Sequence, residues 1–295
     1  MSVLLPKLRV KTRNLRKALR LSVEAFSAEL PLKYELAALL KFRNAAHCLR
    51  EWIEFHRVVG VEHFYLYNHN SSDDFERVLA PYVKERIVTL HHRTGPLVFP
   101  EADAHCFATY KHEARWIAVL DDDEFLFPVS GDDLRKVLRN YEPYPGVVVH
   151  WLMFGSAGHK SSPEGLVIEN YTRCNSMLSH LMKSIVNPRK VLAPKTPHYP
   201  YYKNKELAVN ERKETVPMVI SKTTVADKLR INHYWSKSEA DFKRKMQRGY
   251  GDQDGIDNPR TIKEWDDAEA LLNRSEDTNI MRFLPPLKAR LSEIC

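Results

Sequence analysis

The stretch that decides the fold is Trp116 to Pro128, WIAVLDDDEFLFP. An apolar run, Trp116 to Leu120, leads into four consecutive acids, and Phe125-Leu126-Phe127 then restores the apolar character. So short and continuous an apolar run is typical of a strand that is buried on both faces of a sheet. An unpaired buried charge costs several kcal/mol or more. We therefore predict that the strand reaches a surface or a cleft at Asp121.

The acids that follow this strand are candidate metal ligands. In parallel α/β sheets, ligands gather beyond the carboxyl ends of the strands. If the acidic stretch stays extended, alternation places Asp121 and Asp123 on one side and Asp122 on the other. Two converging carboxylates suit a hard divalent cation, Mg2+ or Mn2+. The alternative is a solvated acidic turn, which the apolar blocks on both sides make less favourable.

The composition is that of a globular chain with a large core. Of its 295 residues, 43% are hydrophobic, which suits one large α/β domain or two smaller ones. No run approaches the ~18 apolar residues of a membrane-spanning helix. The start, MSVLLPKLRV, lacks the apolar core of a signal peptide. The four cysteines are far apart and form no C-x-x-C, so we expect reduced thiols, a cytoplasmic protein and no zinc.

The basic charge is concentrated at the start of the chain. The net charge is +7, from 45 Lys and Arg against 38 Asp and Glu. Seven basic residues precede the first acid, Glu24: Lys7, Arg9, Lys11, Arg13, Arg16, Lys17 and Arg20. Apolar residues at helical spacing, among them Leu15, Leu19 and Phe26, predict an amphipathic helix within an N-terminal extension, residues 1–32. This helix either contacts an anionic membrane surface or a partner, or packs on its own domain.

Residues 33–295 are predicted to form a single α/β domain. Strands and helices alternate through the first half, with strands expected at 35–42, 61–67, 87–90 and 116–121 and helices at 46–59, 75–79 and 101–112. This alternation predicts a mostly parallel central sheet with helices on both faces. The second half is more irregular, with strand-like pieces at 146–151, 166–171 and 183–186 and helices at 132–138, 238–248 and 262–273.

Several blocks of this sequence resemble glycosyltransferase family 92 and its family-2-like bacterial relatives. The blocks are LREWIEFHRVVGVEHFYLYNHNSSDD at 49–74, WIAVLDDDEFLFP at 116–128, GVVVHWLMFGSAGH at 146–159, PEGLVIENYT at 163–172, KSIVNPRKV at 183–191 and INHYWSKSEADF at 231–242. The resemblance implies a GT-A fold, a nucleotide-sugar donor and a divalent metal. It also implies transfer of a hexose to a saccharide or lipid-linked acceptor.

The resemblance further implies which residues hold the metal and the phosphates. His233 stands where a family histidine completes the metal shell beside Asp121 and Asp123, although a core histidine beside aromatic residues is the alternative. Lys237 and Arg248 are candidates for phosphate contacts, against the alternative that charged residues of this kind are simply solvated.

Polar residues at two strand ends are the implied nucleotide contacts. Asn68, Ser71 and Asp73 follow the second strand, where a helix cap and turn would be the alternative role. Asn44 lies in the first strand-to-helix turn. There the family usually carries an acid, and this chain has Ala45 instead, which removes an expected nucleoside contact.

The predicted chemistry is metal-dependent sugar transfer, in which negative charge develops on the diphosphate leaving group. A cation on the donor diphosphate neutralises the charge that builds up as the glycosidic bond breaks. Inversion of configuration, which the family suggests, requires a general base for the acceptor hydroxyl. Glu164 is the candidate base, with an ordinary turn residue between Pro163 and Gly165 as the alternative. We expect an inverting hexosyltransferase that builds a cell-surface polysaccharide from the cytosolic side of the membrane.

Two other functions use the same sequence features. A metal-dependent phosphohydrolase or nucleotidyltransferase could use the acidic cluster, but such sites usually need further carboxylates for a second metal. A non-catalytic basic binding protein would account for the net charge. The sequence carries no nucleic-acid motif and its excess charge lies in residues 1–32, so we expect no nucleic-acid partner.

Overall fold

In the computed structural model, residues 31–94, 99–248 and 261–293 are described. The described residues from Tyr34 onward form one compact unit. The amphipathic helix predicted within residues 1–32 therefore falls outside the described residues. In the described part of the chain, no helix is both long and apolar enough to cross a membrane.

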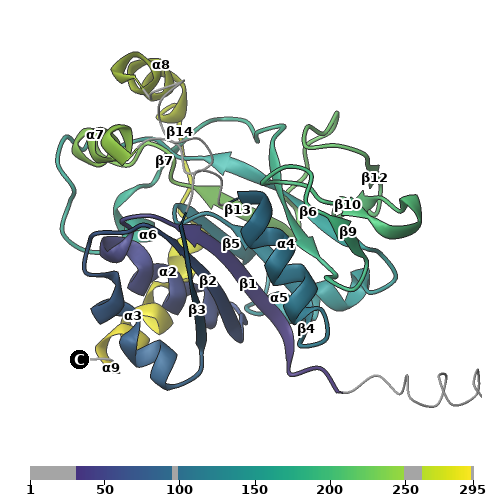
Figure 1. Cartoon of the computed structure of the whole chain (residues 1–295). Helices are drawn as coiled ribbons and strands as arrows, with labels where there is room; N and C mark the ends of the chain where they lie inside the picture. Colours follow the sequence, from purple (N-terminus) through teal and green to yellow (C-terminus); the bar gives the residue numbers. More distant parts are fainter. Residues whose placement is uncertain (1–30, 95–98, 249–260, 294–295) are drawn as a thin grey trace, which may run out of the picture. The chain divides into compact units, whose positions relative to one another are not determined.

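The first half of the compact unit alternates strands and helices as predicted (Figure 1). The elements are β1 (Tyr34–Phe42), α2 (Ala46–Val58), β2 (His63–His69), α3 (Phe75–Lys84), β3 (Val88–Arg93), α4 (Phe99–Tyr110) and β4 (Ala114–Leu120). Strand β1 pairs in parallel with both β2 and β4, and β2 pairs in parallel with β3. The predicted α/β fold with a mostly parallel core is confirmed.

Helices cover both faces of this sheet because β1 has apolar residues at every position of its centre. Leu36, Ala38 and Leu40 enter one hydrophobic core, which α2, α3 and α9 (Leu284–Glu293) close. Ala37 and Leu39 point the other way, into a second core that contains Ala102 and Cys106 of α4. The side-chain period of two in a strand thus produces two cores from one apolar run.

The second half extends the sheet with strands in both directions. Strand β8 (Met182–Val186) lies between β4 and β6 (Gly146–Met153) and is antiparallel to both. The sheet order is β12-β11-β6-β8-β4-β1-β2-β3, and β13 (Leu229–His233) leaves this path to pair with β6 and with β5 (Glu124–Pro128). The remaining elements are α5 (Leu134–Leu138), η1 (Arg139–Tyr141), α6 (Val167–Asn170), β7 (Arg173–Cys174), β9 (Val191–Ala193), β10 (Tyr201–Tyr202), η2 (Lys203–Lys205), β11 (Ala208–Val209), β12 (Thr215–Val216), α7 (Glu239–Arg248), α8 (Ile262–Leu272), β14 (Ser275–Glu276) and η3 (Asn279–Phe283).

The predicted strand at 166–171 is wrong, because a short helix, α6, begins there. The carboxylate of Glu51 on α2 accepts hydrogen bonds from the backbone N–H groups of Val167, at 2.9 Å, and Ile168, at 3.2 Å. These are donors that the first turn of a helix leaves without an intrahelical partner. A side chain 116 residues away in the sequence therefore caps this helix.

The acidic stretch after β4 is a turn and not an extension of the strand. The backbone N–H of Glu124 donates to the carbonyl of Asp121 at 3.1 Å, which closes the turn. Strand β5 then pairs antiparallel with β13, and its Phe125, Leu126 and Phe127 are fully buried. The extended backbone expected at 121–123 is therefore wrong, because the chain must change direction between two buried strands.

Candidate active site

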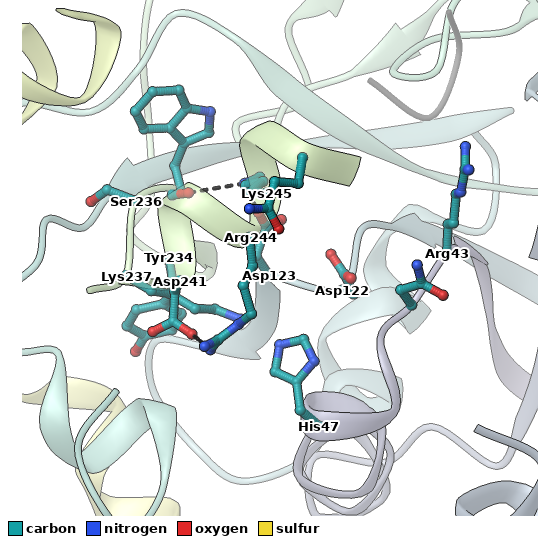
Figure 2. A pocket seen from close by; sticks show the side chains of 13 residues that line it. Arg43, His47, Asp122, Asp123, Tyr234, Ser236, Lys237, Asp241, Arg244 and Lys245 are labelled. Carbon is teal, nitrogen blue, oxygen red and sulfur yellow. Dashed lines mark hydrogen bonds and ion pairs between the residues drawn. The ribbon is translucent and has the colours of Figure 1, made fainter. Parts of the chain in front are cut away.

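A cleft of about 290 Å³ opens beside the acidic turn (Figure 2). Three parts of the chain line it. The connection from β1 into α2 contributes Arg43, Asn44 and His47, and the turn after β4 contributes Asp122 and Asp123. The segment after β13 and helix α7 contribute the other lining residues, Tyr234, Trp235, Ser236, Lys237, Asp241, Arg244, Lys245 and Gln247.

Asp123 contacts two basic side chains. Its Oδ1 lies 3.3 Å from Nε2 of His233, and its Oδ2 forms an ion pair with the ammonium group of Lys245. Lys245 also donates to the carbonyl of Trp235 at 2.9 Å. Burial acts to raise the pKa of Asp123, but Lys245 and His233 outweigh burial and hold that pKa well below its usual range. Asp123 is therefore ionised in the cleft at neutral pH.

The three aspartates do not lie as alternation predicted. Asp122, expected to point away, lines the cleft and is 8% exposed. Asp121 is not among the lining residues, and its Oδ2 accepts from Nζ of Lys183 at 2.7 Å. Burial acts to raise the pKa of Asp121, but Lys183 and Lys41 bring it to about 2. This prediction was wrong because it assumed an extended backbone where the chain turns.

Asp123 and His233 fit a divalent cation as a pair of ligands. Ligands that neighbour one another around an octahedral ion with bonds of about 2.1 Å lie roughly 3 Å apart, close to the 3.3 Å between Asp123 Oδ1 and His233 Nε2. A carboxylate with an imidazole is a donor set that first-row divalent ions accept. Within the described residues, no group of three or more His, Cys, Asp or Glu side chains gathers for a metal. Further ligands of such an ion would come from a bound substrate and water.

The wall formed by α7 and the segment before it is cationic. Lys237 lies on this wall with its backbone in the left-handed region, φ +49°. Burial acts to lower the pKa of Lys237, but nearby groups that include Asp122 and Asp123 raise it above its usual value. Arg244 also lines the cleft and pairs with Asp241.

The sequence prediction named Lys237 and Arg248 for this wall and missed Arg244 and Lys245. Arg248 is the last residue of α7, and its side chain lies outside the described part of the structure. Helical spacing was the signal that could have identified Lys245, because it lies four residues after Asp241 and so shares a helix face with it. What the sequence could not supply was the direction of that face.

The polar residues at the end of β2 and in the loop after it mostly form hydrogen bonds within this loop and with the turn before α2. Asn68 Oδ1 accepts from the backbone N–H of Ser71 at 3.1 Å, and Ser71 Oγ accepts from that of Asn44 at 2.8 Å. Asn44 Oδ1 in turn accepts from the backbone N–H of Ser72 at 2.8 Å. Of the predicted nucleotide contacts in these two loops, Asn44 is the one that lines the cleft.

Asp73 caps a helix that is not its own. Ala45 is the N-cap residue of α2 and has no side chain able to accept a hydrogen bond. Oδ2 of Asp73 accepts a hydrogen bond from the backbone N–H of Ala46 at 2.7 Å and so caps the N-terminus of α2. The sequence offered a helix cap as the alternative role of Asp73. The structure shows such a contact, although Asp73 caps α2 rather than α3.

His47 is a cleft residue that the sequence prediction missed. It follows Ala46 in the first turn of α2 and lines the cleft beside Arg43 and Asn44. Burial and Lys237 lower the pKa of His47, while Asp122 acts in the opposite direction. The histidine therefore lies within the electrostatic reach of both walls of the cleft.

Glu164, the predicted base, is exposed and is not among the residues that line the cleft. Its backbone carbonyl accepts from Nδ2 of Asn170 at 2.9 Å, and Gly165 follows it with φ +94°. These contacts are those of a turn that precedes α6. The position of Glu164 does not favour a role in the cleft.

Comparison with known proteins identifies the family. The model of glycosyltransferase family 92 matches residues 38–264, so the chain belongs to that family. A family 92 protein of Oryza sativa subsp. japonica is 32% identical over 161 residues, which are 52% of this chain and 27% of the relative. The family 92 protein At1g27200 of Arabidopsis thaliana is 28% identical over 179 residues, 57% of this chain and 31% of the relative. The chain thus spans about a third or less of the length of these relatives.

Solved structures are similar at a much lower level. TarS 1–349 of S. aureus in complex with UDP-GlcNAc has a TM-score of 0.36 and 10% identity, with 72% of this chain and 64% of that chain covered. The same protein in complex with UDP also has a TM-score of 0.36, with 9% identity and coverage of 52% and 47%. Likeness at this level does not assign a ligand.

Proposed function

We propose that this protein is a metal-dependent glycosyltransferase that moves a hexose from a nucleotide-sugar to a saccharide or lipid-linked acceptor. The observation that carries the proposal is the cleft itself. Asp123 lines it and contacts His233, which ends β13 and is not itself among the lining residues, and three cations, Lys237, Arg244 and Lys245, line the same cleft. The negative charge of a diphosphate would be attracted to these three cations. Its oxygens could also bind a divalent cation held by Asp123 and His233. Membership of family 92 supports the same activity.

In the proposed mechanism, the cationic wall stabilises the negative charge of the diphosphate leaving group. When bound, Mn2+ or Mg2+ held by Asp123 and His233 supplies positive charge to the diphosphate as the glycosidic bond breaks. Lys237 and Arg244 add fixed positive charge, which is most effective in a partly closed cleft where water is scarce. Lys245 joins the two parts of the site, because its ammonium group contacts Asp123 and its helix forms the wall.

The acceptor hydroxyl must lose a proton if the reaction inverts configuration, as we propose. A base has to lie within hydrogen-bonding reach of that hydroxyl. Glu164 lies outside the cleft, whereas His47 and Asp122 both line it. We therefore assign His47 and Asp122 as candidate bases.

A thermal-shift screen of nucleotide-sugars, with and without Mn2+, tests the proposed function. A ligand that binds only the native state increases the free energy of unfolding by mass action, by about 2.7 kcal/mol at 100 times its dissociation constant, and so raises the melting temperature. We expect one class of nucleotide-sugar to raise the melting temperature, and to raise it further with Mn2+. Hydrolysis of a nucleoside triphosphate, without sugar transfer from any donor, would instead favour the phosphohydrolase or nucleotidyltransferase alternative.

We also propose that the N-terminal extension, residues 1–32, holds the enzyme at the cytosolic face of a membrane, where cell-surface glycan is built. Each basic residue close to an anionic leaflet contributes roughly 1 kcal/mol of attraction. We expect the full chain to float with anionic vesicles at low salt and to be released at high salt. Deletion of residues 1–32, or replacement of the seven basic residues before Glu24 by glutamine, should abolish flotation. Zwitterionic vesicles are the control, and absence of flotation at low salt contradicts the proposal.

A further inference from the structure

A buried lysine lies beneath the acidic turn. Lys183, on β8, is 1% exposed, and its Nζ lies 2.7 Å from Oδ2 of Asp121 and 3.7 Å from Oε1 of Glu124. Strand β8 is antiparallel to β4, the strand that ends at the turn. The only acids that the described structure places within ion-pair distance of Lys183 are thus those at the two ends of the turn.

These contacts fix both ends of the turn. Asp121 uses its side chain for Lys183, its backbone N–H for Oε2 of Glu124 at 3.1 Å, and its carbonyl for the N–H of Glu124. Trp52 of α2 donates its indole N–H to the carbonyl of Glu124 at 2.9 Å. Asp122 and Asp123 lie between these two anchored residues. Their direction into the cleft therefore depends on the anchors.

Stability alone does not account for a lysine at this position. A buried ion pair is often matched or exceeded in stability by apolar side chains of similar volume, because desolvation of two charges offsets their attraction. Glu124 is fully buried as well, and burial raises the pKa of its carboxyl well above the usual range, so its charged form is disfavoured at this position. A buried pair does, however, restrict the geometry of the groups that it joins, and the turn it restricts here carries two cleft residues.

We propose that Lys183 is a positioning residue, which holds the turn through Asp121 and Glu124 so that Asp123 meets His233 at the cation site. This inference rests on the proposed function. It assigns Asp121 to the support of the site and not to the cation itself. Loss of a residue that orients a metal ligand typically weakens metal binding 10- to 100-fold.

The test measures Mn2+ binding by electron paramagnetic resonance, which reports on the ion without requiring turnover. We expect Lys183→Met to weaken Mn2+ binding at least ~10-fold, with Lys183→Arg closer to the parent. Lys190→Met is the control. Nζ of Lys190 lies 3.0 Å from Oε2 of Glu206, so this variant removes a lysine–carboxylate pair that does not involve the acidic turn. Retention of parental Mn2+ binding by a folded Lys183→Met, or an equal loss in Lys190→Met, overturns the proposal.

A double-mutant cycle distinguishes support from ligation. If Lys183 acts through Asp121, then Lys183→Met, Asp121→Asn and the double variant should all weaken Mn2+ binding by similar factors, because the changes remove one shared contact. If Asp121 binds the ion itself, Asp121→Asn will weaken binding far more than Lys183→Met, and the proposal fails. Should Lys183→Met be too unstable to measure, Asp121→Asn alone decides between a ~10-fold loss and an abolished site. Failure of the parent to bind Mn2+ or any nucleotide-sugar would count against the proposed function.

Discussion

Asp123→Asn is expected to abolish metal-dependent donor binding and to lower kcat/KM by at least ~100-fold, the scale of losing one strong electrostatic contact in an active site. The amide keeps the shape of the carboxylate but loses the charge that faces His233 and Lys245. Asparagine also leaves the ammonium group of Lys245, 13% exposed in its side chain, without its main counter-charge. The effect therefore reaches both the cation site and the cationic wall.

Four measurements on this variant separate loss of function from loss of fold. The circular dichroism spectrum should match that of the parent, whereas the melting temperature should fall, because Asn leaves the ammonium group of Lys245 without its counter-charge. Mn2+ binding and nucleotide-sugar thermal shifts should disappear. His233→Ala should weaken the same binding less, because the carboxylate remains. Asp132→Asn is the matched control, an exposed aspartate that pairs with Lys136 on the surface. Parental Mn2+ and donor binding by Asp123→Asn would contradict the assignment of the site.

The sequence predicts the first half of the fold because the signals there are local. Apolar runs bounded by turn residues recur at the spacing of a parallel sheet, and the run in β1 fills both hydrophobic cores. Each of these features depends on neighbours a few residues away. Periodicity arguments are most secure for elements of this kind.

The parts that could not be predicted depend on contacts between residues far apart in the chain. The direction of Asp122 follows from a turn that β5 imposes by pairing with β13, where Glu124 faces His233. The strand predicted at 166–171 is a helix because Glu51 caps it from α2. Lys183 and Lys245, the lysines that pair with Asp121 and Asp123, lie 62 and 122 residues away from them. A sequence pattern identifies acidic residues at a strand end, but the lysines that orient them are visible only in three dimensions.

Glu51 should make the stability of the protein fall as pH rises through the weakly acidic range. The side chain is 9% exposed, and burial raises its pKa from 4.5 to about 7, although hydrogen bonds from the N–H groups of Val167 and Ile168 act in the opposite direction. Between pH 4.5 and 7, the folded protein therefore holds this proton while the unfolded chain has released it. The contribution of Glu51 to the free energy of unfolding is complete below pH 4.5 and falls by roughly 3 kcal/mol as pH rises to 7.

Glu51→Gln removes this titration while retaining a hydrogen-bond acceptor for α6. We expect the difference in free energy of unfolding between parent and variant to shift by roughly 3 kcal/mol, in favour of the variant, as pH rises from 4.5 to 8. The variant should be less stable than the parent at low pH, because one amide oxygen replaces two carboxyl oxygens, each of which accepts a backbone hydrogen bond. Urea unfolding at several pH values measures the difference. Glu76→Gln, at an exposed position on α3, controls for the loss of one acid. A difference between parent and Glu51→Gln that stays constant from pH 4.5 to 8 would show that burial of Glu51 has no energetic consequence in this window.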